Sequence, residues 1–393
     1  MVNEIRKKYN SEFKEAKYQA FVDDLNTSAG VGIDFRICET PLFLSKELTA
    51  ELQAACDEII RQLDTPEYRA FAEASIPDGL AVPNRADHPV FLQIDFAICS
   101  DGKGGFTPRL IELQGFPSLY GFQVYYDDIF RRHFPLPENY TAYYNGHDRD
   151  SYVELLKKTI LGDSSPENVI LLEIEPDKQK TLIDFVVTEQ LTGIKPVCIT
   201  DVIKRGRKLY YVDGGREIPV ERIYNRVIYD ELFRKDVQAA FKFQDDLDVH
   251  WVGHPDWFFL ISKYSLPYLK SEHVPECHFL SDLKEYPTDL ENFVLKPLFS
   301  FAGLGVEVEV TKELLDSKTE RHNYILQRKI EYAPLIETPG GGYSKCEIRM
   351  MYLWNEKPVL VNNLTRFSQG KMMGVDFNKN KTWVGSGTAY HPF

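Results

Sequence analysis

The stretch that decides the fold is Val294-Leu-Lys-Pro-Leu-Phe-Ser-Phe-Ala-Gly-Leu-Gly-Val306, an apolar strand that ends at Lys296 and runs into a loop of small residues. A lysine at the end of an apolar strand is costly to bury, so its ammonium should meet an anion. The loop contains Ser300, Gly303 and Gly305, and small residues let backbone N–H groups approach phosphate oxygens closely. No GxxxxGK[ST] is present, which excludes a Walker loop. A simple hairpin with a snorkelling lysine fits this fragment equally well.

Two further polar patterns follow this loop. Gln327-Arg-Lys329 ends the apolar strand predicted at Tyr324–Gln327, where backbone groups can meet an adenine edge. A plain strand end explains the same run and is the more common case. Glu347 and Arg349 lie two apart on a predicted strand, so their side chains project from the same sheet face. They form either a solvated ion pair or a site whose arginine fork binds phosphate.

An earlier pair of apolar strands carries acidic residues. Val90–Cys99 and Arg109–Gln114 are separated by a DGKGG turn, so we expect a β-hairpin. Asp95 and Glu112 lie inside these strands, and the hairpin allows them to be neighbours. Buried carboxylates repel each other unless a cation neutralises them, and Asp, Glu and amide oxygens suit Mg²⁺. Asp95, Glu112 and Gln114 are therefore candidate metal ligands; alternatively, one carboxylate lies at a sheet edge and the other is salt-bridged.

The rest of the chain predicts a mixed α/β (α+β) fold. Residues 1–75 have helical periodicity, which is clearest over Glu47–Leu63. Asn168–Ile174, Lys178–Leu191 and Lys195–Thr200 follow the order strand, helix, strand of a small Rossmann-like unit. This unit lacks GxGxxG between its first strand and its helix, so we do not predict a dinucleotide site there.

Composition and charge argue against nucleic acids and membranes as partners. The 393 residues carry a net charge of −13, and such an acidic protein is a poor non-specific binder of nucleic acids or anionic membranes. The N-terminal segment lacks the apolar region of a signal peptide, and the longest apolar runs are too short to span a membrane. The six cysteines include no CxxC pair, as expected for reduced thiols. We expect a cytoplasmic protein without nucleic-acid or membrane partners.

Taken in order, the lysine strand, glycine loop, glutamine hinge and E-x-R pair resemble the nucleotide-binding half of ATP-grasp ligases. In most of that superfamily the acidic metal hairpin comes last. Here Asp95 and Glu112-Leu-Gln114 precede the lysine loop. That order resembles the circularly permuted ATP-grasp proteins, of which the glutathionylspermidine synthase family is the best-known member. The resemblance covers roughly residues 77–393.

This resemblance implies a circularly permuted ATP-grasp fold with a Rossmann-like preATP-grasp domain. Residues 1–150 would hold an N-terminal helical region and the metal hairpin. Residues 151–245, with the run Ile-Tyr-Asn-Arg at 223–226, would form the preATP-grasp domain. Residues 246–393 would form the nucleotide-binding region.

The resemblance also implies site residues. Those matching the family's nucleotide-binding positions are Lys263, Lys296, Ser300, Gly303, Gly305, Gln327, Arg328 and Lys329. Asp95, Glu112 and Gln114 match the Mg²⁺ ligands, and Arg349 matches the arginine that stabilises the acyl-phosphate and tetrahedral intermediates. Arg366 is a further catalytic candidate.

Two positions depart from the family pattern. Gln114 stands where the family commonly has asparagine, and Gln93 stands where the synthases carry an arginine that helps to activate the substrate carboxylate. Arg85 or Arg366 could take the place of that arginine.

The implied activity is ATP- and Mg²⁺-dependent ligation of a small-molecule carboxylate to an amine through an acyl-phosphate. A competing hypothesis is a nucleotide-binding regulatory or scaffold protein that has lost ligase chemistry, and its best support is the pair of departures at Gln93 and Gln114. A third and weaker alternative is a kinase-like phosphotransferase on the same fold.

Overall fold

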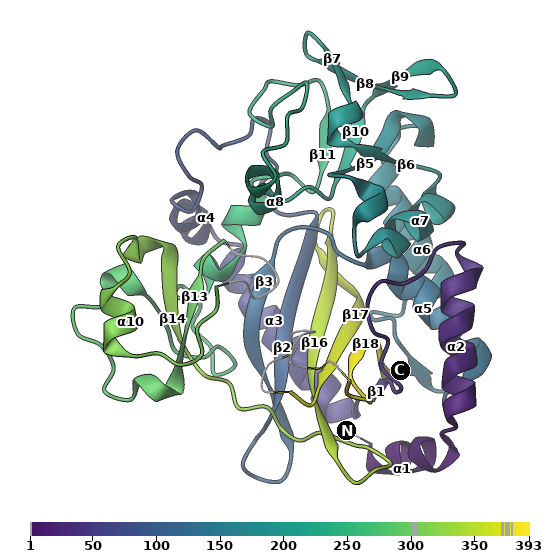
Figure 1. The fold of residues 1–393 in the computed structure, drawn as a ribbon, viewed down its shortest axis with the longest axis vertical. Coiled ribbons are helices and arrows are strands. Elements are labelled where there is room, and N and C mark those ends of the chain that lie inside the picture. The colour runs from purple at the N-terminus through teal and green to yellow at the C-terminus, as the bar shows by residue number, and fades with distance from the viewer. Residues whose placement is uncertain (1, 300–304, 371–372, 374–377, 379) are drawn as a thin grey trace.

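The largest element of the protein is a six-stranded sheet whose paired strands are all antiparallel (Figure 1). It belongs to a computed structural model that describes residues 2–299, 305–370, 373, 378 and 380–393. The strand order is β18-β17-β16-β2-β3, and β15 pairs with β16 outside this path. The strands are β2 (Phe91–Ser100), β3 (Phe106–Gln114), β15 (Ile336–Glu337), β16 (Tyr343–Trp354), β17 (Pro358–Ser368) and β18 (Gly385–Gly387).

Helix α3 (Lys46–Leu63) covers one face of this sheet, as its apolar periodicity predicts. The Ser45 side chain accepts a hydrogen bond from the Leu48 backbone N–H and caps the helix start. The buried stripe of α3 packs against strand side chains in one apolar cluster, which includes Leu48, Leu52, Cys56, Ile59, Leu63, Leu92, Ile94, Phe96, Ile348 and Met350. Because strand side chains alternate, the residues between these point to the opposite face of the sheet.

A second sheet has four parallel strands in the order β11-β10-β5-β6. Its strands are β5 (Val169–Glu173), β6 (Lys195–Cys198), β10 (Arg222–Asn225) and β11 (His250–Val252), and its neighbouring helices are α5 (Tyr120–His133), α6 (Arg149–Leu161) and α7 (Leu182–Thr192). The predicted strand–helix–strand unit is present. Its helix begins at Leu182 rather than Lys178, because Pro176–Lys178 forms a 3-10 turn, and it ends at Gly193 with φ of 80°.

A third, smaller sheet carries the predicted lysine strand. Its order is β12-β14-β13, all antiparallel, with β12 (Cys277–Phe279), β13 (Phe293–Pro297) and β14 (Tyr324–Arg328). An apolar cluster on one face includes residues of β13 and β14 and Leu315 of α10 (Lys312–Asp316). After the glycine loop the chain forms an isolated bridge between Leu295 and Glu307 and no regular strand within residues 305–310.

The N-terminal helices pack beside the large sheet. Phe21 of α2 (Glu15–Ser28) meets Tyr126 and Phe130 of α5 edge-on, within a cluster that also holds residues packed from α1 (Asn3–Glu12). Another small sheet, in the order β1-β19-β4, joins the two ends of the chain. Its strands are β1 (Leu42–Phe43), β4 (Tyr140–Thr141) and β19 (Ala389–Pro392).

The remaining elements are short. A three-stranded sheet, β7-β8-β9, projects beside the parallel sheet (Figure 1), and three further helices have eight residues or fewer. Their bounds are β7 (Ile203–Arg205), β8 (Lys208–Asp213), β9 (Arg216–Val220), α4 (Pro66–Glu73), α8 (Tyr229–Arg234) and α9 (Trp257–Leu260).

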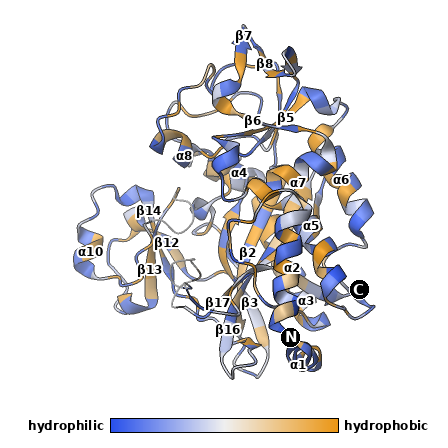
Figure 2. Cartoon of the chain, turned by 45° about the vertical axis from the view of Figure 1, so that its right-hand side comes forward, coloured by the Kyte–Doolittle hydropathy of each residue, from blue (hydrophilic) through white to orange (hydrophobic). Residues whose placement is uncertain are grey.

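Hydropathy follows this layering. Figure 2 shows hydrophobic residues along the central strand β2, whereas the peripheral helix α10 is mostly hydrophilic. Within the described residues, we find no helix with both the length and the apolar character needed for a membrane span.

The packing of α3 on the sheet yields a stability prediction. We expect Leu52→Ala to lower the free energy of unfolding by about 2–5 kcal/mol, because Leu52 is fully buried and its truncation leaves a cavity. The exposed Asp57→Ala on the same helix should change it by less than about 0.5 kcal/mol. Urea unfolding monitored by circular dichroism measures both, and equal effects would contradict this packing.

Candidate functional site

Polar residues gather on the face of the large sheet opposite α3. In the hairpin β2–β3, Asp95 stands directly opposite Glu112, as the hairpin predicted. On its other side Asp95 stands opposite Arg349 of β16. Glu347 of β16 stands opposite Arg366 of β17. Directly opposed residues share a sheet face, so four strands present these five side chains together.

Asp95 is the most heavily engaged of these carboxylates. It is 1% exposed, and both of its oxygens accept hydrogen bonds from Arg349, each at 2.7 Å. Arg366 donates to Oδ2 of Asp95, also at 2.7 Å, and lies 3.2 Å from Oε2 of Glu347. Burial lowers the pKa of Arg366, but Glu347 and Asp95 outweigh that effect and raise its pKa overall. Asp95 therefore binds two arginines from different strands.

Glu112 stands among four cations. Burial alone would raise the pKa of its carboxyl, but Lys263, Arg366, Arg349 and Lys296 outweigh burial and lower it. Glu112 is consequently ionised at neutral pH.

The two lysines reach this cluster from outside the large sheet. Lys296 ends β13, and its Nζ donates to the Ile111 carbonyl oxygen at 3.4 Å. Lys263 begins a 3-10 turn, Lys263–Ser265, and is 8% exposed. Burial lowers the pKa of each lysine, while Glu112 raises it. Segments that are distant in sequence thus place both ammonium groups near one carboxylate.

Cations outnumber carboxylates in this cluster by one. The four cations face the carboxylates of Asp95, Glu112 and Glu347, and burial raises the pKa of Glu347. Buried cations in excess of buried anions favour an anionic ligand, for which lysines and arginine forks are suited. We refer to Asp95, Glu112, Glu347, Lys263, Lys296, Arg349 and Arg366 as the charged cluster.

Gln327 lies on the same face of the small sheet as Lys296. It is paired with Val294 across β13 and β14, and Val294 and Lys296 are two residues apart. Gln327 is fully buried, and neither atom of its amide has a hydrogen-bond partner within the described part of the chain. An unpaired buried amide is costly, and a ligand edge with one donor and one acceptor would satisfy it.

The other hinge residues do not reach the charged cluster. Arg328 forms ion pairs with Glu276 and Asp289, and its guanidinium lies over the Phe293 ring. The backbone N–H of Lys329 donates to the Asn292 carbonyl oxygen, and its ammonium is also bound to backbone. Arg328 directly follows Gln327 on β14, so its side chain lies on the opposite face of the small sheet.

The glycine loop is only partly described. Ser300 and Gly303 lie outside the described residues. Gly305 has φ of 73°, and a Cβ there would lie 2.9 Å from Cγ of Pro297. This position requires glycine, which lets the chain turn back beside β13.

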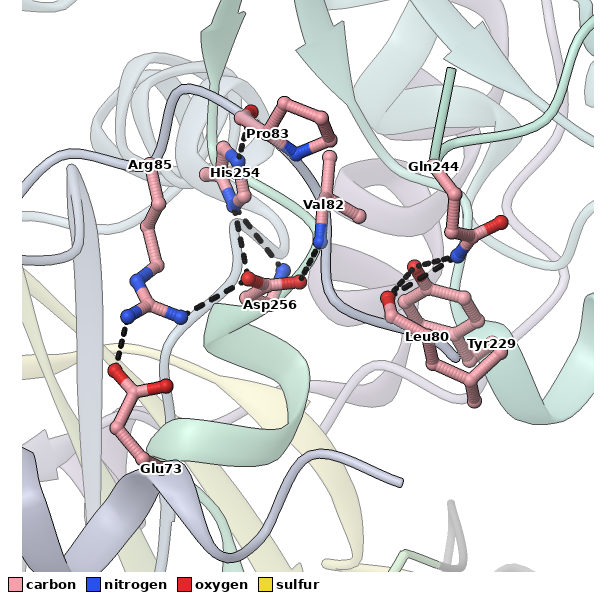
Figure 3. Close-up of polar contacts among 9 residues, drawn as sticks. All are labelled: Glu73, Leu80, Val82, Pro83, Arg85, Tyr229, Gln244, His254 and Asp256. Carbon is pink, nitrogen blue, oxygen red and sulfur yellow. Dashed lines mark hydrogen bonds and ion pairs between the residues drawn. The ribbon is translucent and has the colours of Figure 1, made fainter. Parts of the chain in front are cut away.

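Arg85 is not at the cluster. Figure 3 shows its guanidinium between Glu73 and Asp256, with the Asp256 contact at 3.0 Å. Asp256 also accepts the Val82 backbone N–H at 3.1 Å, so this aspartate ties the segment before β2 to the start of α9. Arg85 and Arg366 were the two candidates to replace the arginine that the family carries at the position of Gln93. Of these two, Arg366 lies beside Asp95 and Glu347, whereas Arg85 does not.

Sequence reasoning missed one residue of the site. The Tyr332 hydroxyl donates to Oε1 of Glu347 at 2.5 Å. Tyr332 pairs only by an isolated bridge with Cys99, in a segment without regular structure. Since no periodic pattern surrounds it, the sequence carried no signal for its position.

The three candidate magnesium ligands fit that ion in part. Glu112 is ionised, and Oε1 of Gln114 is buried without a partner among the residues described. The Gln114 amide nitrogen donates to Glu112 at 3.0 Å, which fixes the two side chains together. Asp95, in contrast, has both oxygens bound by arginines. No group of three His, Cys, Asp or Glu side chains with metal-binding geometry occurs in the described ranges.

The arginine pairs of Asp95 yield a second prediction. We expect Asp95→Asn to lower the free energy of unfolding by about 3–5 kcal/mol, because it leaves Arg349 and Arg366 without their shared counter-charge. Asp150→Asn is the matched control, since its ion pair with Arg149 is exposed and is worth at most about 1 kcal/mol. Chemical unfolding of the two variants measures the difference, and similar losses would argue against a buried arginine–aspartate centre.

Comparisons with known proteins find likeness in structure alone. No protein-family model matches the sequence, and no curated protein matches it. Among solved structures, a glutathione synthetase-like effector from Globodera pallida, determined in its apo form, superimposes with a TM-score of 0.56. The match covers 90% of this chain and 94% of that chain, at 13% sequence identity. The chain therefore shares a fold with a glutathione synthetase-like protein, at a distance that sequence comparison does not detect.

Proposed function

We propose that the protein is an ATP-dependent ligase that joins a carboxylate to an amine, on a circularly permuted ATP-grasp fold. The observation that carries the proposal is the convergence of Lys263, Lys296, Arg349 and Arg366 around Glu112. These cations come from separate parts of the chain, and their excess charge suits the phosphates of a nucleotide. The glutathione synthetase-like neighbour supports the same class of fold.

The nucleotide would lie between the small and large sheets. In this arrangement Lys296 and Lys263 contact its phosphates. Gln327 offers a buried donor and acceptor on the same face as Lys296, which suits the edge of a purine base. Base and phosphates then bind to adjacent parts of one surface.

The proposed chemistry has two steps. A carboxylate oxygen of the substrate attacks the γ-phosphorus of ATP, and the bond to the β-phosphate oxygen breaks with release of ADP. The amine then attacks the acyl carbon, loses a proton and displaces inorganic phosphate. Arg349 and Arg366 would neutralise charge on the transferring phosphoryl group and on the tetrahedral intermediate, because positioning and charge stabilisation account for most of phosphoryl-transfer catalysis.

Two residues of the site have oxygen atoms suited to a magnesium ion. Glu112 and Gln114 would hold the ion, which when bound neutralises charge on the phosphates. Asp95 would keep Arg349 and Arg366 in place, as its hydrogen bonds to both arginines indicate.

A second candidate function is nucleotide binding without ligation. One observation that supports it is that both oxygens of Asp95 accept hydrogen bonds from arginines. The other is that Gln93 is uncharged and its amide donates a hydrogen bond to the Ser118 carbonyl oxygen. Measurement of ADP release separates the two functions, since a binding protein would bind ATP without turning it over.

Lys296 provides the first test. We expect Lys296→Ala to weaken binding of a non-hydrolysable ATP analogue about tenfold to a hundredfold, since a charge-assisted contact contributes about 1.5–3 kcal/mol. Lys157→Ala is the control, because Lys157 is exposed on α6 and is not among the predicted site residues. Calorimetric titration measures both, and unchanged affinity in a folded Lys296→Ala protein would overturn the assignment.

Glu112 provides the test of chemistry. We expect Glu112→Gln to abolish magnesium-dependent ADP release in the presence of pooled amino acids and polyamines, while binding of ATP without magnesium is largely kept. The substitution preserves side-chain size, removes the negative charge and replaces one carboxylate oxygen with an amide nitrogen. Glu313→Gln, at an exposed position on α10, should behave as the wild type. Retained turnover in Glu112→Gln would exclude Glu112 from the metal-dependent step.

A further inference from the structure

A cavity of about 200 Å³ lies between the N-terminal helices and the segment that follows α5. One face of α1 lines it with Ile5, Lys8, Tyr9 and Glu12, which are neighbours on the helix surface because they lie three or four residues apart. None of the lining residues belongs to the charged cluster. Figure 1 shows α1 and α2 on the side of the molecule away from β13 and β14, so this cavity is separate from the proposed nucleotide site.

Aromatic rings form much of the apolar wall of this cavity. Phe43 and Phe134 are buried, and the Tyr9 ring packs beside both, with its centre 5.9 Å from that of Phe43 and 5.7 Å from that of Phe134. The Tyr9 hydroxyl donates to the Glu39 carbonyl oxygen at 2.8 Å, which holds this ring in place. An apolar cavity of about 150 Å³ takes up benzene, so the present one has room for a single aromatic ring with a short chain.

A buried arginine adjoins this aromatic wall. The Cζ atom of Arg6 lies 5.2 Å from the centre of the Phe43 ring and 5.7 Å from that of Tyr9. Its guanidinium donates to the Thr40 hydroxyl and, at 2.6 Å, to the Pro41 carbonyl oxygen, and no carboxylate pairs with it among the described residues. Burial lowers the pKa of Arg6 to about 10, so it stays charged at neutral pH. The rings therefore lie beside a positive charge that has only neutral partners.

Two lysines add positive charge at the cavity itself. The Nζ atom of Lys17 lies 5.1 Å from the centre of the Phe134 ring, and Lys8 lines the cavity from α1. Neither lysine forms an ion pair with a residue that the structure describes, and Glu12 is the acidic residue in the lining. Aromatic rings can bind a cationic ligand through their faces, but cations of the protein already lie over these three rings. A further cation would be repelled, whereas an anion would be attracted.

We propose that this cavity binds a small aromatic carboxylate, with its ring against Tyr9, Phe43 and Phe134 and its carboxylate at Lys8 and Lys17. The ring would gain from burial and from tilted contacts with the aromatic wall. The carboxylate would gain from hydrogen bonds to ammonium groups that lack a counter-ion. The proposal goes beyond the proposed function, because this ligand is not a reactant of the ligation and occupies a separate site.

The test compares four probes of similar size by calorimetric titration of the full chain at low salt. These are 3-phenylpropanoate, the neutral 3-phenylpropan-1-ol, the cationic 3-phenylpropan-1-amine and the aliphatic hexanoate. We expect 3-phenylpropanoate to bind about threefold to tenfold more tightly than the alcohol, since ion pairs at partly exposed lysines make a modest contribution. The amine should bind more weakly than the alcohol, and hexanoate should bind more weakly than 3-phenylpropanoate because it lacks the ring.

Two variants separate the charge of the site from its shape. Lys17→Met keeps a long side chain without the charge, so it should lower the affinity for 3-phenylpropanoate about threefold and leave that for the alcohol unchanged. Lys14→Met is the matched control, because Lys14 is exposed at the start of α2 and does not line the cavity. Ile5→Trp should fill the cavity and abolish binding of both probes, and the half-buried position of Ile5 leaves room for the larger side chain to be accepted without loss of the fold.

The proposal is overturned if 3-phenylpropanoate shows no saturable binding, or if the alcohol, the amine or hexanoate binds as tightly as it does. It is also overturned if Lys17→Met or a folded Ile5→Trp protein keeps full affinity for 3-phenylpropanoate, or if Lys14→Met loses as much affinity as Lys17→Met. Folded Ile5→Trp should bind the ATP analogue as the wild type does, and a joint loss of both ligands would contradict a separate site. Circular dichroism establishes that each variant is folded, and Lys17→Met tests the proposal even where Ile5→Trp does not fold.

Discussion

The hydrogen-bonded ion pairs of one buried aspartate with two arginines hold the centre of this protein together. Asp95 on β2 receives three N–H groups from Arg349 on β16 and Arg366 on β17, all at 2.7 Å. Charges at this depth must be paired, because their desolvation is otherwise several kcal/mol unfavourable. The pairing therefore constrains the register of three adjacent strands. It also keeps two guanidinium groups on one side of the sheet, beside Glu112, where the remaining cations arrive.

The two lysines reach the charged cluster from parts of the fold outside the large sheet. Lys296 belongs to the small sheet and Lys263 to a turn after α9, whereas Glu112 belongs to the large sheet. An anion bound among them would neutralise charges from all three parts and strengthen their association. Figure 3 shows how the connecting segments are tied down on another side, with Tyr229 and Gln244 both bonded to the Leu80 carbonyl oxygen. These contacts hold the segment before β2 against α8 independently of the charged cluster.

Likeness to a glutathione synthetase-like effector leaves chemistry and binding as separate questions, because a fold can persist when a reaction is lost. The oxygen atoms of three side chains bear on whether the protein ligates its substrates or only binds a nucleotide. Glu112 and the unpaired oxygen of Gln114 provide oxygen donors, while Asp95 is bound by arginines. Oxygen donors of this kind suit a nucleotide-bound magnesium ion in a ligase and in a binding protein alike.

The sequence by itself determined the elements that depend on local pattern. The two apolar runs Val90–Cys99 and Arg109–Gln114, with the DGKGG turn between them, predicted the hairpin that pairs Asp95 with Glu112, and the apolar spacing of Glu47–Leu63 predicted α3. Such patterns are visible because helix and strand periods act over a few residues. Glu347 and Arg349 were also recognisable, since residues two apart on a strand share a face.

Only the tertiary structure decided how these pieces meet. Arg349 lies opposite Asp95 across 254 residues of sequence, and Arg366 rather than Arg85 completes the centre. The outward direction of Arg328 likewise depends on what packs around its strand. Local periodicity specifies which face a side chain occupies, but the partner on that face is set by pairing between distant strands, whose free energy depends on the packing of the entire core.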